Sequence, residues 1–431
     1  MVVRARVVVT MNGPPIENGA VAISAGRIIE VGEFSEIQRT HIGGEIVDLG
    51  ERVLLPGLVN AHCHLEYTCL RGQIPRPKSF TDWILAINAA KAKLSPDDYA
   101  NSISDGFAEA KKFGTTTVAN LTAFPELIER IAAPIRTWWL AELIDVRTPE
   151  RGKEIAEYAM QTIANLAGST SQVGQTPQGW GLAPHAPYTA SADLYRSCQE
   201  VAQREDILLT THLAESREEM AMFRDRRGSL YDFLSGIGRD MTDCGGKTPL
   251  QSFYERAGPS SPRDESVRLA DRTRKADRPY LVAHLNELAE RDFELLAKSK
   301  TGFSVVHCPR SHDYFGHSPF QFEKLKRLNC NICLGTDSLA SNKDLSLFAE
   351  MRAFRQEFPN VAPGEILSMA TVNGARALGQ ENAIGKIAPG FFADLIAIGT
   401  EKSNSVLEET VTFERQPDWF MIGEVPTRSP R

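Results

Sequence analysis

A strand-then-helix rhythm in the middle of the chain constrains its fold more than any other feature. Short apolar or β-branched runs alternate with longer stretches of helical composition, such as Pro96–Phe113 and Glu287–Lys298. Eight runs are expected to be strands: Val53–Ala61, Thr115–Leu121, Ile135–Leu143, Trp180–Pro184, Ile207–His212, Tyr280–His284, Gly302–His307 and Asn331–Thr336. Eight strands alternating with helices predict an α/β protein built as a (β/α)8 TIM barrel.

The two chain ends differ from the middle of the chain in their residue pattern. From residue 1 to about 53, short β-branched runs are separated by Gly and Pro turns, and similar sequence returns at Gly390–Ile398. We therefore expect a small β-sandwich domain built from both ends, with residues 1–56 and 385–431 flanking a barrel over residues 57–384. This span exceeds the ~250 residues typical of the fold, so insertions are expected. The largest, Arg217–Pro279, is predicted to be a lid or docking loop.

Charge and cysteine content exclude several classes of partner. The net charge is -7 and no basic block stands out, so a nucleic-acid partner is not expected. The seven cysteines lack the spacing of a disulfide scaffold, which is typical of the reducing cytoplasm. No apolar run is long enough to cross a membrane, and the first residues lack the features of a signal peptide. These observations predict a cytoplasmic protein that acts on a small molecule.

Histidines gather at the ends of the predicted strands. Side chains two apart on a strand share a face, so His62 and His64 point the same way. Because barrel active sites lie at the carboxyl ends of the strands, residues at these ends are expected to meet. Imidazoles with a carboxylate are typical ligands of a divalent metal, although His62 and His64 alone are also compatible with ordinary strand-end histidines. The strand-end candidates are His64, His185, His212, His284, His307 and Asp337.

Several motifs in chain order resemble the amidohydrolase superfamily, and more narrowly its deaminase and chlorohydrolase branch. That branch includes cytosine, guanine, S-adenosylhomocysteine and aminodeoxyfutalosine deaminases. The resemblance covers nearly the whole chain. The motifs are His62-Cys63-His64, His212-Leu213-Ala214-Glu215, His284, His307-Cys308-Pro309, Gly335-Thr336-Asp337-Ser338-Leu339-Ala340-Ser341-Asn342, Asn373–Gly379 and Gly385–Leu395.

The resemblance implies one divalent metal ion, zinc or alternatively iron. Its ligands would be His62, His64, His212 and Asp337. Binuclear relatives need a carboxylated lysine at strand four, but that strand ends here in Ala183-Pro184-His185-Ala186-Pro187. A bound divalent ion lowers the pKa of its water to ~7 and so supplies hydroxide at neutral pH.

The resemblance also implies three catalytic roles. Glu215 would protonate the ring nitrogen beside the attacked carbon, and Asp337 would accept the proton of the water. His284 would hydrogen-bond that water and stabilise the tetrahedral adduct. The alternatives from the residues alone are a helix N-terminal carboxylate for Glu215 and a buried core histidine for His284.

Candidate substrate-binding residues fall into two groups. Asp82-Trp83, Arg136 and His185 match positions that contact the sugar or tail in adenosine-type deaminases. Their alternatives are a helix N-terminal charge, a surface arginine and a strand-end histidine bonded to backbone. The second group departs from the S-adenosylhomocysteine deaminase pattern and looks closer to aminodeoxyfutalosine deaminases. It comprises Glu66, Arg310, His312 and His317.

The second group suggests how a substrate tail is bound. Arg310, His312 and His317 are predicted to hold a carboxylate, with loop packing as the alternative. The predicted function is hydrolytic deamination of an adenine-type nucleoside: aminodeoxyfutalosine first, then S-adenosylhomocysteine or methylthioadenosine. A chlorohydrolase or a guanine- or cytosine-type deaminase is the alternative within the superfamily, and a non-catalytic binding barrel is the alternative outside it. Oligomers are common in the resembled family, which leaves a homo-oligomer open.

Overall fold

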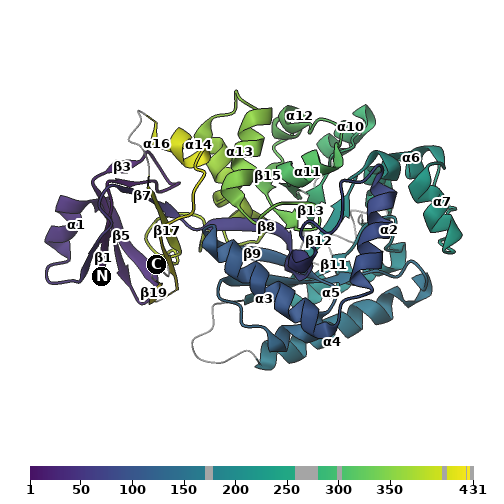
Figure 1. Ribbon diagram of the computed structural model, residues 1–431, viewed down its shortest axis with the longest axis horizontal. Coiled ribbons are helices and arrows are strands. Elements are labelled where there is room, and N and C mark those ends of the chain that lie inside the picture. Colours follow the sequence, from purple (N-terminus) through teal and green to yellow (C-terminus); the bar gives the residue numbers. More distant parts are fainter. Residues whose placement is uncertain (170–177, 258–279, 299–302, 400–404, 424, 428–431) are drawn as a thin grey trace, which may run out of the picture.

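The computed structural model describes residues 1–169, 178–257, 280–298, 303–399, 405–423 and 425–427. Figure 1 shows two parts side by side: a β-rich part that contains the first and last described strands, and a larger part in which helices surround a parallel sheet. In these ranges no helix has both the length and the apolar character of a membrane span.

The parallel sheet of the larger part confirms the predicted alternation of strands and helices. Its strand order is β15-β14-β13-β12-β11-β10-β9-β8-β16, so strands adjacent in the chain from β8 to β15 are adjacent in the sheet. The bounds are β8 (Leu58–His64), β9 (Thr115–Thr122), β10 (Arg136–Leu143), β11 (Gln178–Pro184), β12 (Leu208–Leu213), β13 (Tyr280–His284), β14 (Ser304–His307), β15 (Asn331–Leu334) and β16 (Asp337–Ser338).

The sheet curls until its last segment returns to its first strand. β15 pairs with β14, whereas β16 pairs with β8, where Asp337 lies opposite Cys63. Gly335 lies between β15 and β16, and a Cβ there would lie 2.8 Å from the carbonyl oxygen of His62. A side chain at this position would therefore separate the two strands. The arrangement is a TIM-like barrel, and its closure brings Asp337 beside the histidines of β8.

Helices cover the outside of this sheet. The predicted helix Pro96–Phe113 forms α3 (Pro96–Lys112), which begins with a capping box between Ser95 and Asp98. The other helices are α1 (Phe34–Thr40), α2 (Phe80–Lys91), α4 (Gly152–Ser169), α5 (Ala192–Glu205), α6 (Arg217–Asp225), α7 (Ser229–Gly236), α8 (Pro249–Ala257), α10 (Glu290–Lys298), α11 (Pro309–Phe315), α12 (Phe322–Arg327), α13 (Leu347–Glu357), α14 (Pro363–Met369), α15 (Val372–Ala377) and α16 (Val406–Val411). Short 3-10 helices are η1 (Leu65–Leu70), η2 (Pro125–Arg130) and η3 (Pro149–Arg151).

The predicted strand Val53–Ala61 is wrong as a single element. It is two strands, β7 (Arg52–Pro56) and β8, which belong to different sheets. The chain changes sheet at Gly57, where an added Cβ would lie 2.1 Å from Oγ1 of Thr116. Only glycine fits this close approach, so the Pro56-Gly57 pair marks where the barrel begins.

Two smaller sheets make up the β-rich part. One has the order β5-β4-β1-β6 and the other β19-β18-β17-β7-β2-β3, so strands from the two chain ends pair directly. In the second sheet, β17 runs antiparallel to β7. The bounds are β1 (Val2–Arg4), β2 (Val7–Val8), β3 (Ile16–Glu17), β4 (Gly19–Ser24), β5 (Arg27–Glu33), β6 (Ile46–Asp48), β17 (Leu395–Gly399), β18 (Trp419–Ile422) and β19 (Val425–Thr427).

The predicted insertion lies beyond β12. Its first part folds into α6, α7 and α8, and residues 258–279 lie outside the described residues. Phe223 and Leu230 of this part are fully buried in an apolar cluster with Phe80 of α2. The described part of the insertion thus packs beside α2, and its lid or docking role stays a prediction.

Candidate active site

Three buried imidazoles converge at the carboxyl ends of β8 and β12. His62 and His64 lie on one face of β8, as the two-residue period predicts. The Nε2 atoms of His64 and His212 are 3.2 Å apart, and one ligating nitrogen of each of the three rings lies within 4.8 Å of the others. These side chains come from strands 148 residues apart in sequence, so the barrel itself builds the cluster.

The environment keeps these histidines neutral. Burial, followed by the neighbouring histidines, lowers the pKa of His62 and His64 well below the usual range, and burial lowers that of His212 to about 4. His212 donates from Nδ1 to the carbonyl oxygen of His185 at 3.0 Å, which leaves its Nε2 lone pair directed at His64. Both ring nitrogens of His62 are buried without a hydrogen-bond partner. Neutral imidazoles with available lone pairs fit a divalent metal ion.

A second group of titratable side chains faces the imidazoles. Oδ1 of Asp337 lies 3.8 Å from Nε2 of His62, and Oε1 of Glu215 lies 3.6 Å from Nε2 of His284. Donor and acceptor atoms of Glu215, His284 and Asp337 all lie within 4.8 Å of one another. Three imidazoles that could hold a metal ion therefore lie close to two carboxylates and a further imidazole, an arrangement suited to hydrolytic proton transfer.

Neighbouring groups fix the Asp337 carboxylate. Its Oδ2 accepts from the Ser311 hydroxyl at 2.7 Å, and its Oδ1 accepts from the Ser338 N–H at 2.7 Å. The backbone of Asp337 has φ 56°, and those of His284 and Ala214 have φ 75° and 50°. Left-handed conformations at residues other than glycine cost roughly 1–3 kcal/mol each and gather at functional sites. The surrounding fold thus holds these three strand ends in strained geometry.

Glu219 holds the turn that carries Glu215. The N–H groups of Ala214 and Glu215 donate to its carboxylate at 3.3 and 2.7 Å. Burial raises the pKa of Glu215 and, more moderately, that of Glu219, to about 8. A raised pKa leaves Glu215 able to carry a proton near neutral pH, as a general acid must. Glu219 was not among the predicted site residues, although Ser216-x-x-Glu219 is a capping-box pattern that could have indicated it.

Glu66 and His185 also lie beside the imidazole cluster. Glu66 is fully buried, and its Oε2 accepts from the Thr122 hydroxyl at 2.8 Å and from the Ala123 N–H at 3.1 Å. Burial, and then the charge of Glu142, raises the pKa of Glu66 to about 7. The His185 ring centroid lies 4.8 Å from that of His212. Glu142, at the end of β10, was not found from the sequence because it belongs to no motif.

Arg136 lies at the opposite end of the barrel, so its expected contact with substrate is wrong. It is the first residue of β10, whereas the site lies beyond the last, about 20 Å further along the strand. Its Nε and Nη2 donate to the carboxylate of Asp394 at 2.5 and 3.1 Å, and both side chains are buried. The guanidinium also stacks over Phe392 at 3.8 Å. Arg136 therefore joins the barrel to the β-rich part.

Replacing Arg136 is expected to change stability and not substrate binding. Arg136→Ala leaves the buried Asp394 carboxylate without its partner, which should lower the free energy of unfolding by about 3–5 kcal/mol. Arg130→Ala is the control, because Arg130 pairs with Asp97 on the surface and should cost about 0–1 kcal/mol. Urea denaturation gives both values, and a raised KM without loss of stability would contradict the assignment.

Asp82 and Trp83 have separate surroundings. Asp82 is exposed in the first turn of α2, where its N–H donates to Ser79 Oγ at 3.1 Å, as the helix N-terminal alternative describes. Among the described residues, no recorded contact joins Asp82 to the imidazole cluster. Trp83 packs against Phe80 and Phe315. The structure thus does not bring Asp82 to the site.

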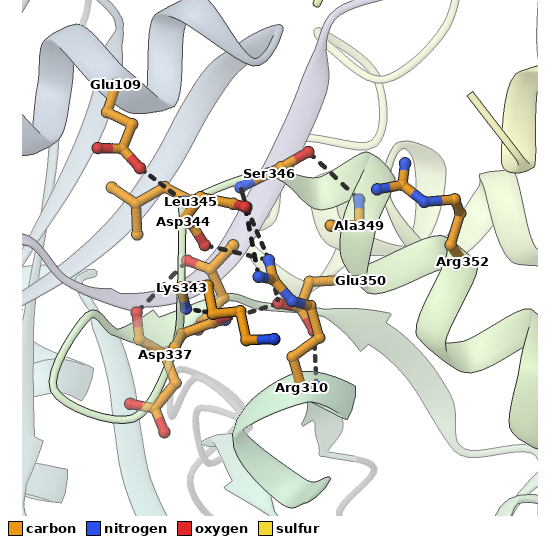
Figure 2. Close-up of polar contacts among 12 residues, drawn as sticks. Glu109, Arg310, Asp337, Lys343, Asp344, Leu345, Ser346, Ala349, Glu350 and Arg352 are labelled. Atoms are coloured by element: carbon orange, nitrogen blue, oxygen red, sulfur yellow. Dashed lines mark hydrogen bonds and ion pairs between the residues drawn. The ribbon is translucent and has the colours of Figure 1, made fainter. Parts of the chain in front are cut away.

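Arg310 is paired with acidic side chains of the chain itself, and its predicted contact with a substrate carboxylate stays a prediction. Figure 2 shows its guanidinium between Asp344 and Glu350, with Nη1 at 2.7 Å from Oδ1 of Asp344 and 3.8 Å from Oε1 of Glu350. The Arg310 N–H also donates to Glu350 at 2.9 Å. Asn342 donates to both Glu350 and the carbonyl oxygen of Thr336, at 2.7 and 2.8 Å. This network supports the segment that carries Asp337.

Glu350 is expected to make the protein less stable as pH rises. Burial raises the pKa of its carboxyl from 4.5 to about 7. A group with a higher pKa in the folded state stabilises the fold fully below the unfolded pKa, and this contribution is lost as pH rises through the folded value. Between about pH 5 and pH 8, the stability of Glu350→Gln relative to the unmodified protein should therefore rise by up to about 3 kcal/mol. Urea denaturation at both pH values, with the exposed Glu381→Gln as control, measures this; a pH-independent difference would contradict it.

His312 and His317 border a cleft of about 1220 Å³ that runs from α11 to α13. Burial lowers the pKa of His312 to about 4 and that of His317 to about 3, so both are neutral at pH 7. His312 Nδ1 donates to Oδ1 of Asn286 at 3.0 Å, and Asn286 Nδ2 donates to the carbonyl oxygen of Glu215 at 3.0 Å. His312 thus supports the Glu215 turn, and its contact with a substrate tail stays a prediction.

The chain belongs to the amidohydrolase family, which matches residues 53–422. It is thus a hydrolase of that family. It is 30% identical over 406 residues to the 5-methylthioadenosine/S-adenosylhomocysteine deaminase of Syntrophobacter fumaroxidans, covering 92% of this chain and 83% of that protein.

Two solved structures share the fold over nearly the full length of both chains. The aminofutalosine deaminase of Helicobacter pylori, in complex with methylthio-coformycin, has a TM-score of 0.82 with 20% identity, and 99% of each chain is covered. An adenosine deaminase from Xanthomonas campestris with bound zinc has a TM-score of 0.75 with 24% identity, covering 99% of this chain and 92% of that one. At these identities the likeness concerns the fold.

Proposed function

We propose that this protein is a metal-dependent hydrolytic deaminase of an adenine-type nucleoside. The observation that carries the proposal is the buried Glu215 carboxyl, with its raised pKa, at 3.6 Å from His284 and beside the cluster of neutral imidazoles. Deamination needs a proton donor for the ring nitrogen as well as a nucleophile, and Glu215 can be that donor at neutral pH. The name of the 30% identical relative supports an adenosine-type substrate.

One divalent ion, zinc or alternatively iron, would be held by His62, His64, His212 and Asp337. The unpartnered nitrogens of the fully buried His62 support this assignment, because imidazole nitrogens buried without a partner are costly unless something binds them. When bound, the ion would lower the pKa of a water molecule and supply the nucleophile near neutral pH. Strand four, β11, ends at Pro184, directly before His185, and has no lysine, which supports a single ion.

The other roles belong to side chains of the chain itself. Glu215 would donate its proton to the ring nitrogen beside the attacked carbon, since burial raises its pKa and favours the protonated form. Asp337 would accept the proton that the attacking water loses, through the oxygen facing His62. His284 would hydrogen-bond the developing oxyanion. Glu66, Trp83, His185, His312 and His317 stay candidates for substrate contacts.

The preferred substrate carries a tail at the sugar. Aminodeoxyfutalosine is our first candidate, and S-adenosylhomocysteine and methylthioadenosine are the second. Because Arg310 is paired with Asp344, a carboxylate-bearing tail would have to bind without a free guanidinium from this residue. The neutral His312 and His317 can offer hydrogen bonds but no charge. Turnover must decide between the two candidates.

Ammonia release from a substrate panel tests the proposal. Zinc-loaded protein is assayed with aminodeoxyfutalosine, S-adenosylhomocysteine, methylthioadenosine, adenosine, guanine and cytosine. We expect strong turnover of one adenine nucleoside and little of guanine or cytosine. Release of ammonia only from guanine or cytosine, or from none of the panel, would contradict the proposal.

We also propose that residues 1–56 and 385–431 form one small β-sandwich beside a barrel over residues 57–384. Supporting this, one apolar cluster joins the two smaller sheets: Val3 and Val21 from the first, Leu54 and Leu395 from the second. All four side chains are completely buried. Shared burial of this kind is what holds two sheets face to face.

A further inference from the structure

A buried hydrogen-bond acceptor without a donor lies beside the imidazole cluster. Oε1 of Glu142, at the end of β10, is buried and has no hydrogen-bond partner. Ligating atoms of Glu142, His185 and His212 lie within 4.8 Å of one another. Among the described residues, no hydrogen bond or ion pair is recorded between Glu142 and His185. A buried carboxylate oxygen is costly unless a donor reaches it, so this position is suited to a ligand.

His185 is the second polar group at this position. Its Nδ1 lies 2.6 Å from Oγ1 of Thr189, and the Thr189 hydroxyl donates to the carbonyl oxygen of Ala186 at 3.3 Å. Either atom can donate in the 2.6 Å contact, so His185 Nε2 can accept or donate a hydrogen bond. Glu142 therefore calls for a hydrogen-bond donor, and a hydroxyl, which both donates and accepts, suits Glu142 and either form of the His185 ring.

A second metal ion is a poorer occupant than a group with hydroxyl donors. His212, the third member of the group, already directs its Nε2 at His64, 3.2 Å away, and its Nδ1 bonds the carbonyl oxygen of His185. One nitrogen lone pair cannot bind two ions, so only Glu142 and His185 remain for a second one. Two ligands are fewer than the three or four that protein zinc sites use. Hydroxyl hydrogen bonds of about 2.7–2.8 Å, in contrast, fit two polar groups separated by a few ångströms.

We propose that Glu142, beside His185, accepts a hydrogen bond from the hydroxyl pair of the substrate sugar and so selects ribonucleosides over deoxynucleosides. The inference rests on the proposed function, which supplies an adenine nucleoside. It moves sugar recognition from the exposed Asp82 of α2 to the strand ends next to the metal ligands. Because both groups are fixed by the barrel, the sugar is held at a set distance from the imidazole cluster.

The test combines variants that lack the Glu142 carboxylate with substrates that lack one sugar hydroxyl. Values of kcat/KM are measured for adenosine, 2′-deoxyadenosine and 3′-deoxyadenosine with the zinc-loaded protein, Glu142→Ala, Glu142→Gln and the exposed control Glu126→Gln. The unmodified protein and the control should prefer adenosine by about 10- to 100-fold over at least one deoxynucleoside, as expected for a hydrogen bond to a charged group. In Glu142→Ala, kcat/KM for adenosine should fall by this factor, while kcat/KM for that deoxynucleoside should stay unchanged. The preference for adenosine should therefore disappear. Glu142→Gln should retain part of it.

Three results would overturn the inference. An unchanged preference in a folded Glu142→Ala variant would show that Glu142 does not contact the sugar. Loss of bound zinc in that variant would make Glu142 a metal ligand instead. Equal turnover of all three nucleosides by the unmodified protein would show that the sugar hydroxyls are not recognised. If the unmodified protein deaminates no adenine nucleoside at all, the proposed function fails and the inference falls with it.

Discussion

Glu215→Gln is expected to keep the metal and the fold yet reduce kcat roughly 10²- to 10⁴-fold. Glutamine has the same shape as glutamate but has no acidic proton to give to a ring nitrogen. The backbone of this turn is held by Glu219 and Asn286, not by the Glu215 side chain, so its position should not change. Ammonia release measures kcat, and zinc content per chain and circular dichroism report the metal and the fold.

An exposed glutamate provides the matched control for this variant. Glu200→Gln, on the surface of α5, should leave kcat unchanged. Normal activity of Glu215→Gln would remove Glu215 from the proton transfer. Loss of zinc or of helical signal in that variant would show a structural role in place of the proposed acid.

Asp337→Asn is expected to have a comparably large effect through two causes. The amide is a weak metal ligand, and it cannot accept the proton of the attacking water. We expect kcat to fall roughly 10²- to 10⁴-fold, together with weaker zinc binding. The Ser311 and Ser338 hydrogen bonds should still place the side chain, so the fold is retained.

Kinetics and zinc titration separate the two causes for Asp337. Saturating zinc restores part of the activity if only metal affinity is lost, and none of it if proton acceptance is lost as well. Asp105→Asn, at an exposed position of α3, is the control. A fully active Asp337→Asn variant would contradict both roles.

The sequence predicted the centre of the site because local rules place these side chains. The two-residue period of a strand puts His62 and His64 on one face, and the carboxyl ends of barrel strands meet at one edge. His212 and Asp337 follow from the same rules once their strands are recognised. Two strands at the two ends of the alternation, β8 and β16, then pair directly in the structure.

The peripheral residues depended on distant partners that no local pattern reveals. Arg136 matched a motif position, but it binds Asp394, which lies 258 residues away in the sequence. Both residues lie at the end of the barrel away from the candidate site. The sequence pattern suggested that Arg310 is available to bind a substrate, but in the folded chain Glu350 of α13 lies beside its guanidinium. Glu142 belongs to no motif, and only the folded barrel shows that its carboxylate oxygen is buried without a donor. A motif identifies residue types, whereas their availability depends on the neighbours that folding supplies.

Zinc titration of metal-free protein during turnover of the best substrate in the panel tests the central claim most directly. The chain is stripped with a chelator, zinc is added back stepwise, and ammonia release is recorded beside the zinc bound per chain. We predict no turnover without metal and a rise that ends at one zinc ion per chain. Full turnover by metal-free protein, or a rise that continues to two bound ions, would contradict a single ion held by His62, His64, His212 and Asp337.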